Sequence, residues 1–442
     1  MPELLAGAAV ADITPPVGVM MDGYGARTTP SQGVHDPLMA RVVALEKAGA
    51  SAAIVSCDLL GMHPWITAEV RRRAEEGHGI RADGVIVAAT HDHAAPIGLR
   101  AGMFARLDEA AAATLVETIM DAIGEAWEAR RAASLSVAQA RVDTISQNRR
   151  DPDWPIDSEL RVVLVDGEAG PIASIVNFAC HATVLNADNL FLSGEFPGHA
   201  ARLLLRETGA PCVYLNGACG DVNPSWIRQD FASVERAGQI VGGAALRLVA
   251  EMRALGPGQR IHNVRWDEFP EVAPLGRTVV ASLKVARREV EIPARDFEDD
   301  ESYVSRIEQA KMAREGAGDE SARRGAAALI SRYEGERWAA AWARRSPTPE
   351  RTEVQVIRLG KGLAVVALPG EFLTETGEAV RAAVDGDVVV AGYANDYVGY
   401  VVPEHSYDEG GYEPGVTFYA PEAESIIRES AISLLKEVCD GD

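Results

Sequence analysis

The sequence predicts an α/β fold with a mixed, largely buried central β-sheet flanked by helices. Short runs rich in Val, Ile and Ala show little alternation of apolar and polar residues, which is typical of strands buried on both faces. Amphipathic stretches of helical period separate these runs. Apolar residues make up 47% and charged residues 24% of the 442 residues, so the chain is globular and has ample material for a core.

The expected strands and helices alternate along the chain. The strand-like runs are residues 41–46, 52–57, 84–89, 172–179, 212–215, 363–368 and 388–391. The helix-like stretches are residues 65–76, 108–133, 197–207 and 231–252. Residues 296–345 are rich in Glu, Arg and Ala, so we expect a helical insertion packed against the sheet, either a solvated hairpin or a lid over the active site. Because no Ser-, Gly- or Pro-rich linker divides the chain, we expect a single catalytic domain over residues 1–442.

Charge and cysteine usage restrict the class of protein. The formal net charge of −22 argues against a nucleic-acid partner and against stable association with an anionic membrane. Five scattered cysteines without a CxxC pair fit reduced, buried thiols. The N-terminus has no secretory pattern, and no apolar run reaches the roughly 18 residues of a membrane span. We therefore expect a cytoplasmic protein that binds a small-molecule substrate, and the sequence leaves a homo-oligomer open.

Residues with metal-binding chemistry follow several expected strands. Ligands bind beyond the carboxyl ends of strands in open α/β sheets, so these side chains should meet at one edge. They are His91, His93, His181, Glu371, Tyr397 and Tyr400. Alone, each has an ordinary explanation: core histidines, packing tyrosines, and Glu371 at the start of a helix over residues 371–384. Together, imidazoles and a carboxylate at one edge favour a metal site, and they suit zinc.

Three further polar residues are candidates for supporting roles. Arg149 is either a clamp for an anion or carbonyl group or an exposed basic residue. Asp58, which follows a buried strand, is a candidate for orienting a histidine ligand. Asp221 follows Gly220, and we expect it to stabilise a turn.

These residues lie in motifs that resemble the catalytic domain of the neutral, non-lysosomal ceramidase family. The matching stretches keep the family's order and spacing from residue 7 to residue 413. They are GAAVADITPP (7–16), ATHDHAAPIG (89–98), QNRR (147–150), NFACHAT (177–183), SGEFPGHAA (193–201), NGACGDVNP (216–224), PGEF (369–372) and NDYVGY (395–400).

The resemblance implies a zinc hydrolase that cleaves an amide. The residues at the family's zinc-binding positions are His91, His181, Glu371 and Tyr400. A tyrosinate ligand is chemically reasonable, because zinc lowers the pKa of a bound hydroxyl. The resemblance also implies that His93 and Arg149 contact the scissile group and that Tyr412 completes the contacts with the oxyanion.

Two departures separate this sequence from the family pattern. The ceramidases have a Gly-Asp-Val-Ser-Pro segment with its serine at the active centre. Here Asn223 replaces that serine, and Ser225 lies two positions away. Asn223 can still donate a hydrogen bond to an oxyanion. The sequence also ends without the β-sandwich that follows the ceramidase catalytic domain, so it resembles a shorter, bacterial-type member.

We predict a zinc-dependent amidase that cleaves a soluble small molecule with water activated by one zinc ion. His93 would carry a proton from the water to the leaving nitrogen. Arg149, Tyr412 and Asn223 would stabilise the oxyanion. A hydrolase of esters, lactones or ceramide-like lipids would use the same site. The alternative of another class is a non-catalytic binding protein on the same fold. Pocket shape should depend on the loop of residues 100–106 and on the helical insertion.

Overall fold

The computed structural model describes residues 3–99, 107–225, 228–255, 276–345, 348 and 350–440. The strands are β1 (Leu4–Asp12), β2 (Gly33–Val34), β3 (Met39–Lys47), β4 (Ala50–Cys57), β5 (Val85–Ala89), β6 (Arg131–Arg141), β7 (Ser146–Asn148), β8 (Glu159–Gly167), β9 (Gly170–Phe178), β10 (Phe191–Leu192), β11 (Cys212–Asn216), β12 (Val222–Pro224), β13 (Arg277–Val279), β14 (Ala281–Glu291), β15 (Arg351–Gly360), β16 (Leu363–Ala367), β17 (Glu371–Phe372), β18 (Asp387–Ala391) and β19 (Tyr400–Val401). The helices are α1 (Pro64–His78), α2 (Glu109–Glu128), α3 (Glu195–Thr208), α4 (Phe231–Leu255), α5 (Asp300–Glu315), α6 (Glu320–Ala343), α7 (Thr374–Arg381), α8 (Ser406–Glu409), α9 (Tyr412–Val416) and α10 (Ala423–Cys439), with a short 3-10 turn at Ala82–Gly84.

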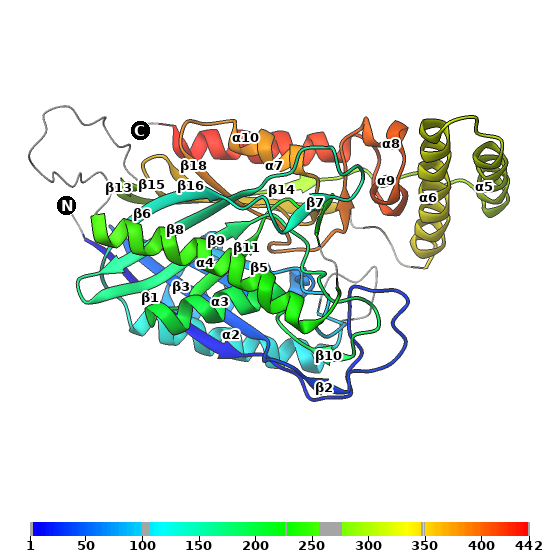
Figure 1. Ribbon diagram of the computed structural model, residues 1–442. Coiled ribbons are helices and arrows are strands. Elements are labelled where there is room, and N and C mark those ends of the chain that lie inside the picture. Colours follow the sequence, from blue (N-terminus) through cyan, green and yellow to red (C-terminus); the bar gives the residue numbers. More distant parts are fainter. Residues whose placement is uncertain are drawn as a thin grey trace, which may run out of the picture.

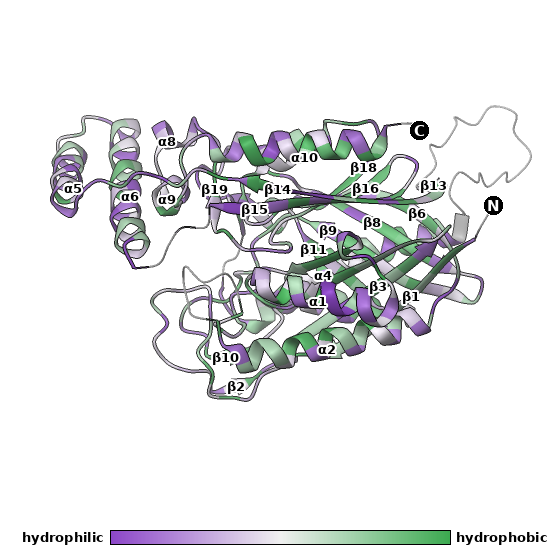
Figure 2. Cartoon of the chain, turned by 180° about the vertical axis from the view of Figure 1, so that it is seen from behind, coloured by the Kyte–Doolittle hydropathy of each residue, from purple (hydrophilic) through white to green (hydrophobic). Residues whose placement is uncertain are grey.

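A large mixed sheet confirms the predicted fold class. Its strand order is β11-β9-β8-β6-β1-β3-β4-β5, and β13 also pairs with β6. The pairs β4–β5 and β9–β11 are parallel, and the other pairs are antiparallel. Figure 2 shows apolar residues throughout these strands, as expected for a sheet covered on both faces.

A second, smaller sheet lies on the first, which the sequence did not predict. Its order is β14-β15-β16-β18, and it contains two of the predicted runs, residues 363–368 and 388–391. Apolar side chains of both sheets, such as Ile54 and Val365, share one buried cluster. Helices α1 to α4 cover the outer face of the large sheet, and α7 and α10 cover that of the small one, so the chain forms four layers (Figure 1).

The local predictions hold for most elements and fail at two. Each of the seven predicted strand runs falls within a strand, to within one residue at its ends. The predicted helix 108–133 is wrong at its end, because β6 begins at Arg131 and pairs with β1 and β8. That alanine-rich stretch has high helix propensity, which sheet pairing overrides. The predicted helix 371–384 is shorter, since Glu371 and Phe372 form β17 and α7 begins at Thr374.

The predicted insertion at residues 296–345 is a helical hairpin of α5 and α6, which projects from one end of the layers (Figure 1). The carboxylates of Asp299 and Asp319 accept hydrogen bonds from first-turn amides, each at 2.8 Å, and so fix both helix starts. Helix α6 packs against α9, where a Cβ on Gly335 would lie 2.9 Å from Gly415. A side chain at either glycine would push the two backbones apart, so the two glycines allow α6 to pack closely against α9.

All five cysteines are free thiols, and only Cys439 is partly exposed. Among the described helices, none has both the length and the apolar character needed to cross a membrane. The extent of the single domain, residues 1–442, remains a prediction, because residues 256–275 lie outside the described part of the chain.

Candidate active site

The four predicted zinc ligands converge in one buried cluster. His91 and His181 follow the carboxyl ends of β5 and β9, and their ring centroids are 4.7 Å apart. Glu371 and Tyr400 stand opposite each other in the parallel pair β17–β19. The Glu371 Oε2 atom lies 3.3 Å from the Nε2 atoms of both His91 and His181. The Tyr400 hydroxyl lies 3.4 Å from His181 Nε2. Long-range topology thus brings together residues more than 300 positions apart.

Backbone carbonyls determine which nitrogen of each imidazole faces the cluster. His91 Nδ1 lies 2.9 Å from the Leu60 carbonyl, and His181 Nδ1 lies 2.7 Å from the Cys219 carbonyl. A carbonyl can only accept, so each Nδ1 carries the proton and each Nε2 presents a lone pair. Such an outer hydrogen bond is the usual support of a metal-binding histidine.

The cluster fits a divalent cation. Glu371 Oε2 is buried, has no hydrogen-bond partner among the described residues, and faces the Nε2 atoms of two imidazoles. Burial raises the pKa of Glu371, and positive charge on the facing side, from a protonated imidazole or a bound cation, brings this pKa well below its usual value. Burial, together with Arg149, lowers the pKa of His181 to about 4. The carboxylate is therefore ionised and His181 neutral near pH 7, and this nitrogen and oxygen donor set suits zinc.

Two tyrosines support the cluster from behind. The Tyr397 hydroxyl donates a hydrogen bond to Glu371 Oε1, which leaves Oε2 directed at the histidines. The Tyr393 ring stacks on His91, with centroids 3.9 Å apart. Sequence reasoning placed Tyr397 at the same sheet edge, with packing as the alternative, and missed Tyr393. The φ angles of His91 (62°) and Tyr393 (56°) are positive, which is unfavourable for residues with side chains and often marks functional sites.

His93 lies in the same cluster, but no backbone carbonyl of the described residues binds its Nδ1 atom as in His91 and His181. The ligating atoms of His91, His93 and His181 all lie within 4.8 Å of one another, and His93 Nε2 is 3.2 Å from His91 Nε2. His93 Nδ1 is buried and has no hydrogen-bond partner among the described residues. Burial and the neighbouring imidazoles lower the pKa of His93 well below its usual value, so the ring is neutral near pH 7.

A loop near the N-terminus positions His93, and sequence reasoning did not identify it. A Cβ on Gly23 would lie 2.4 Å from His93 Nδ1. The Tyr24 ring lies 5.0 Å from the His93 ring, centroid to centroid. Arg27 is buried and donates to the carbonyls of Asp22 (2.7 Å) and His93 (2.9 Å). The available signal was two glycines beside a tyrosine, which indicates close backbone approach.

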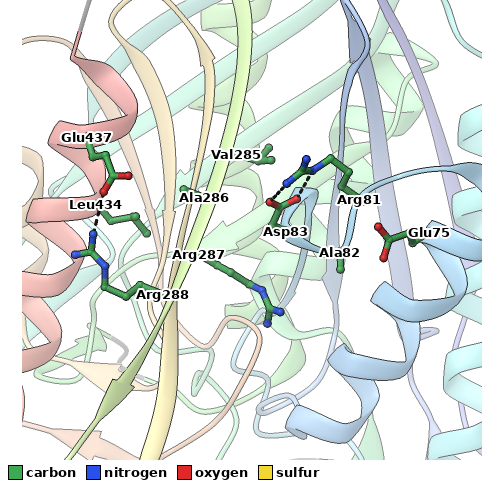
Figure 3. Close-up of a pocket in the computed structure, with 10 residues that line it drawn as sticks. All are labelled: Glu75, Arg81, Ala82, Asp83, Val285, Ala286, Arg287, Arg288, Leu434 and Glu437. Atoms are coloured by element: carbon green, nitrogen blue, oxygen red, sulfur yellow. Dashed lines mark hydrogen bonds and ion pairs between the residues drawn. The ribbon is translucent and has the colours of Figure 1, made fainter.

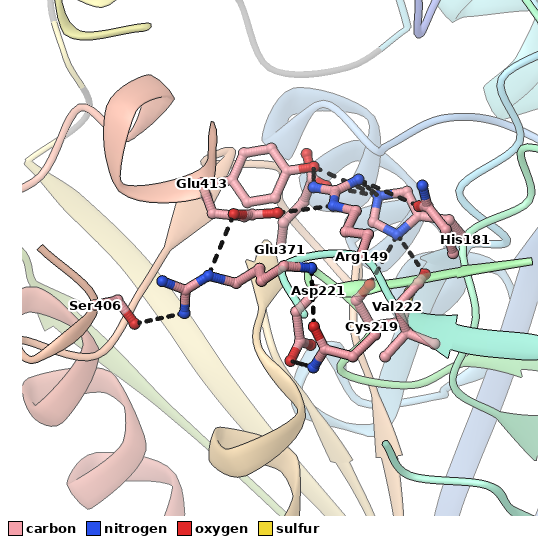
Figure 4. Close-up of polar contacts among 12 residues, drawn as sticks. Arg149, His181, Cys219, Asp221, Val222, Glu371, Ser406 and Glu413 are labelled. Carbon is pink, nitrogen blue, oxygen red and sulfur yellow. Dashed lines mark hydrogen bonds and ion pairs between the residues drawn. The ribbon is translucent and has the colours of Figure 1, made fainter. Parts of the chain in front are cut away.

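Arg149 is a half-buried clamp rather than an exposed basic residue (Figure 4). Its guanidinium donates to the Tyr400 hydroxyl at 2.7 Å, to Glu413 Oε1 at 2.7 Å and to Asn223 Oδ1 at 3.3 Å. Burial lowers the pKa of Arg149, but Tyr400 and Glu413 outweigh it and raise the pKa well above its usual value. The guanidinium is therefore charged and lies beside the cluster of histidines.

Two supporting predictions have different outcomes. Asp221 does stabilise the local structure, since its carboxylate accepts from Asn148 Nδ2 at 2.9 Å and from the Thr374 amide at 2.8 Å. The role suggested for Asp58 is wrong. Asp58 forms a bidentate pair with Arg41, at 2.7 and 2.9 Å, and Leu60 supplies the hydrogen bond to the ring of His91.

Tyr412 and Asn223 lie at the outer side of the cluster. Tyr412 begins α9 and is 51% exposed, with its ring 5.7 Å from the Tyr400 ring and 5.5 Å from the Arg149 guanidinium. Arg149, Asn223 and Tyr412 also line an open cavity of about 1330 Å³. The cavity therefore meets the cluster at Arg149, which donates a hydrogen bond to Tyr400, while the histidines are not part of its lining. Residues 100–106, expected to shape the pocket, lie outside the described residues.

A second cleft, of about 730 Å³, lies at the opposite end of β5 and carries no comparable chemistry (Figure 3). Its arginines are paired: Arg81 with Asp83 at 2.9 Å, and Arg288 with Glu437 at 2.9 Å. Arg287, the third arginine of this lining, pairs with Glu353 at 3.0 Å, so a neighbouring carboxylate compensates each arginine charge, and the lining includes no histidine or cysteine.

Comparison with known families agrees with this site. The family described as neutral/alkaline non-lysosomal ceramidase, N-terminal, matches residues 4–213 and 337–429. The chain belongs to this ceramidase family.

Curated ceramidases and a solved ceramidase structure are similar to most of the chain. Neutral ceramidase A of Dictyostelium discoideum is 23% identical over 98% of this chain and 72% of its own length. The neutral ceramidase of Pseudomonas aeruginosa is 23% identical over 94% of this chain and 69% of its own length. The crystal structure of neutral ceramidase from Pseudomonas aeruginosa superposes with a TM-score of 0.75 at 20% identity, over 99% of this chain and 75% of that one. At this identity the structural likeness shows a shared fold.

Proposed function

We propose that this ceramidase-family chain is a zinc-dependent hydrolase of an amide bond. The observation that carries the proposal is the buried Glu371 Oε2 atom, which has no hydrogen-bond partner among the described residues and lies 3.3 Å from the Nε2 atoms of both His91 and His181. A divalent cation between these three atoms would stabilise all of them by accepting their electron pairs. With Tyr400 beside them, these four residues would hold the metal.

The remaining residues supply proton transfer and charge stabilisation. Bound zinc would polarise the amide carbonyl and lower the pKa of a water molecule toward neutrality. His93, whose Nδ1 is not tied to a carbonyl, takes a proton from the attacking water and delivers it to the leaving nitrogen. The charged Arg149 guanidinium stabilises the negative charge that develops on the carbonyl oxygen. Tyr412 and Asn223, which border the same cavity, add donors at its outer side.

We propose a ceramide-like lipid amide as the substrate class. The names of the relatives support this class over the soluble small molecule expected from the charge. The open cavity is bordered by two exposed aromatic side chains, Trp154 and Tyr412. Their apolar surface also supports a substrate in which the amide carries an apolar group. The acidic composition and the free thiols support the cytoplasmic location expected from the sequence. Cell fractionation tests that location.

Metal analysis combined with a substrate panel tests the proposed function. We expect about one zinc ion per chain and hydrolysis of a short-chain ceramide that stops on chelation and returns with zinc. The panel includes a soluble N-acyl amide and the ester matched to each amide. His181→Ala should abolish zinc binding and activity, whereas His78→Ala, outside the cluster, should change neither. Full zinc and activity in His181→Ala would refute the proposal, and a folded wild type without zinc would favour the binding-protein alternative.

A further inference from the structure

Glu413 is a buried carboxylate at the start of α9 that the proposed mechanism does not use. It is 1% exposed, whereas its neighbour Tyr412 is 51% exposed. Its Oε1 atom accepts a hydrogen bond from Arg149 Nε at 2.7 Å (Figure 4), and its buried Oε2 atom lies 3.6 Å from Arg150 Nε. Burying a carboxylate is costly unless its charge is compensated, and here two consecutive arginines compensate it.

Three acceptors from different elements fix the direction of the Arg149 guanidinium. Glu413 Oε1 takes the Nε hydrogen, the Tyr400 hydroxyl accepts from Nη2 at 2.7 Å, and Asn223 Oδ1 accepts from Nη1 at 3.3 Å. A guanidinium has a single N–H donor on Nε and a pair on each terminal nitrogen. The donors that these contacts leave over therefore belong to the terminal nitrogens, and Nη1 lies 3.5 Å from His181 Nε2 in the metal cluster.

Contacts outside the metal cluster hold the chain on both sides of Glu413. Arg295 donates a hydrogen bond to the Pro414 carbonyl at 2.8 Å, and Arg150 donates to the Gly410 carbonyl at 3.0 Å. An arginine side chain has several rotatable bonds and loses much entropy when it is ordered. A carboxylate on a fixed segment is therefore well suited to orient it.

We infer that Glu413 is the positioning residue for Arg149: by accepting the Nε hydrogen, it turns the terminal nitrogens of that guanidinium toward Tyr400 and the carbonyl oxygen of the substrate. The inference rests on the proposed function, in which Arg149 stabilises the oxyanion, and it adds the residue that aims this group. A group that stabilises charge only in the transition state affects kcat more than KM. Misalignment of Arg149 should therefore appear in kcat.

Glu413→Gln keeps the size of the side chain and removes its charge. We expect a loss in kcat of about tenfold or more on a short-chain ceramide, with KM within about threefold of wild type. Zinc per chain, measured by mass spectrometry, should be unchanged, because Glu413 is not among the residues proposed to hold the metal.

Glu336→Gln is the matched control for loosening of the same helix. Glu336 is a carboxylate that is 3% exposed and accepts a hydrogen bond from Arg295, the residue that holds the Pro414 carbonyl. It is not among the described partners of Arg149. This variant should lower Tm about as much as Glu413→Gln and keep kcat within about twofold of wild type.

A double-mutant cycle with Arg149→Ala separates positioning from stability. Arg149→Ala should lose about 100-fold in kcat, and Glu413→Gln should cost nothing further in this background. Arg149→Ala also leaves a space bordered by acceptors of Glu413, Tyr400 and Asn223. Millimolar guanidinium chloride should therefore restore kcat by about tenfold in Arg149→Ala and not in the double variant.

Three results would each overturn the inference: equal losses in kcat for Glu413→Gln and Glu336→Gln, an undiminished loss on adding Glu413→Gln to Arg149→Ala, or equal rescue of the single and double variants. If Glu413→Gln does not unfold cooperatively, Glu413→Asp replaces it, since aspartate keeps the charge but is shorter by one methylene. Wild-type kcat in Glu413→Asp would then overturn the inference. Hydrolysis of no amide by the zinc-loaded wild type would instead refute the proposed function, and this inference with it.

Discussion

Gly23→Ala is expected to displace the catalytic candidate His93 by steric contact, while every polar side chain of the site is kept. The added Cβ would lie 2.4 Å from His93 Nδ1, whereas ordinary contact begins near 3.4 Å, so the ring or the loop must move by about 1 Å. A displacement of that size at a catalytic group reduces the rate by about 100-fold. Gly23 also has a φ of +89°, and alanine in this region costs about 1–2 kcal/mol of folding stability.

Gly18→Ala is the control that separates the displacement of His93 from the stability cost of alanine at a positive φ angle. Gly18 has a φ of +103° and no atom within 4 Å of an added Cβ, so its variant carries the backbone cost without contact to His93. Both variants should lose similar thermal stability, measured as Tm. Gly23→Ala alone should lose about 100-fold in kcat/KM for the amide and retain its zinc.

The result that would refute this reasoning is a kcat/KM for Gly23→Ala within twofold of that for Gly18→Ala. Loss of zinc in Gly23→Ala alone would give a different answer, namely that His93 binds the metal directly. Zinc per chain is therefore measured on both variants by mass spectrometry before the kinetics.

Two further expectations follow from buried groups near the site. Tyr397→Phe removes the hydrogen bond to Glu371 Oε1, so zinc affinity measured by chelator competition should fall about 10–100-fold; an unchanged affinity would contradict the supporting role. Burial raises the pKa of Glu195 from 4.5 to about 8, so between these values the folded state keeps a proton that the unfolded state releases. Stability should therefore fall as pH rises through this range, by at most about 1.4 kcal/mol per pH unit, and the slope in urea unfolding should flatten in Glu195→Gln. A wild-type slope no steeper than that of the variant would exclude this contribution.

Sequence reasoning placed His91 and His181 at one edge of the sheet because their signal is local, and the resemblance to the family added Glu371 and Tyr400 as ligands. His91 and His181 each follow a run of buried apolar residues, and such runs end at a sheet edge whatever the topology. The same reasoning failed for residues 131–133, because helix propensity is local and the pairing of β6 with β1 and β8 is not. It also failed for Asp58, whose partner Arg41 lies on the neighbouring strand.

The sequence by itself determined seven of the buried strands and which residue types are available for a metal and a proton. It could not determine that two sheets stack, because an apolar strand is equally satisfied by a helix or by a second sheet. Only the tertiary structure decided that Gly23 contacts His93, that Arg149 lies between Tyr400 and Glu413, and that α6 borders the cavity. Each of these depends on contacts between segments far apart in the chain, which local patterns of hydrophobicity do not encode.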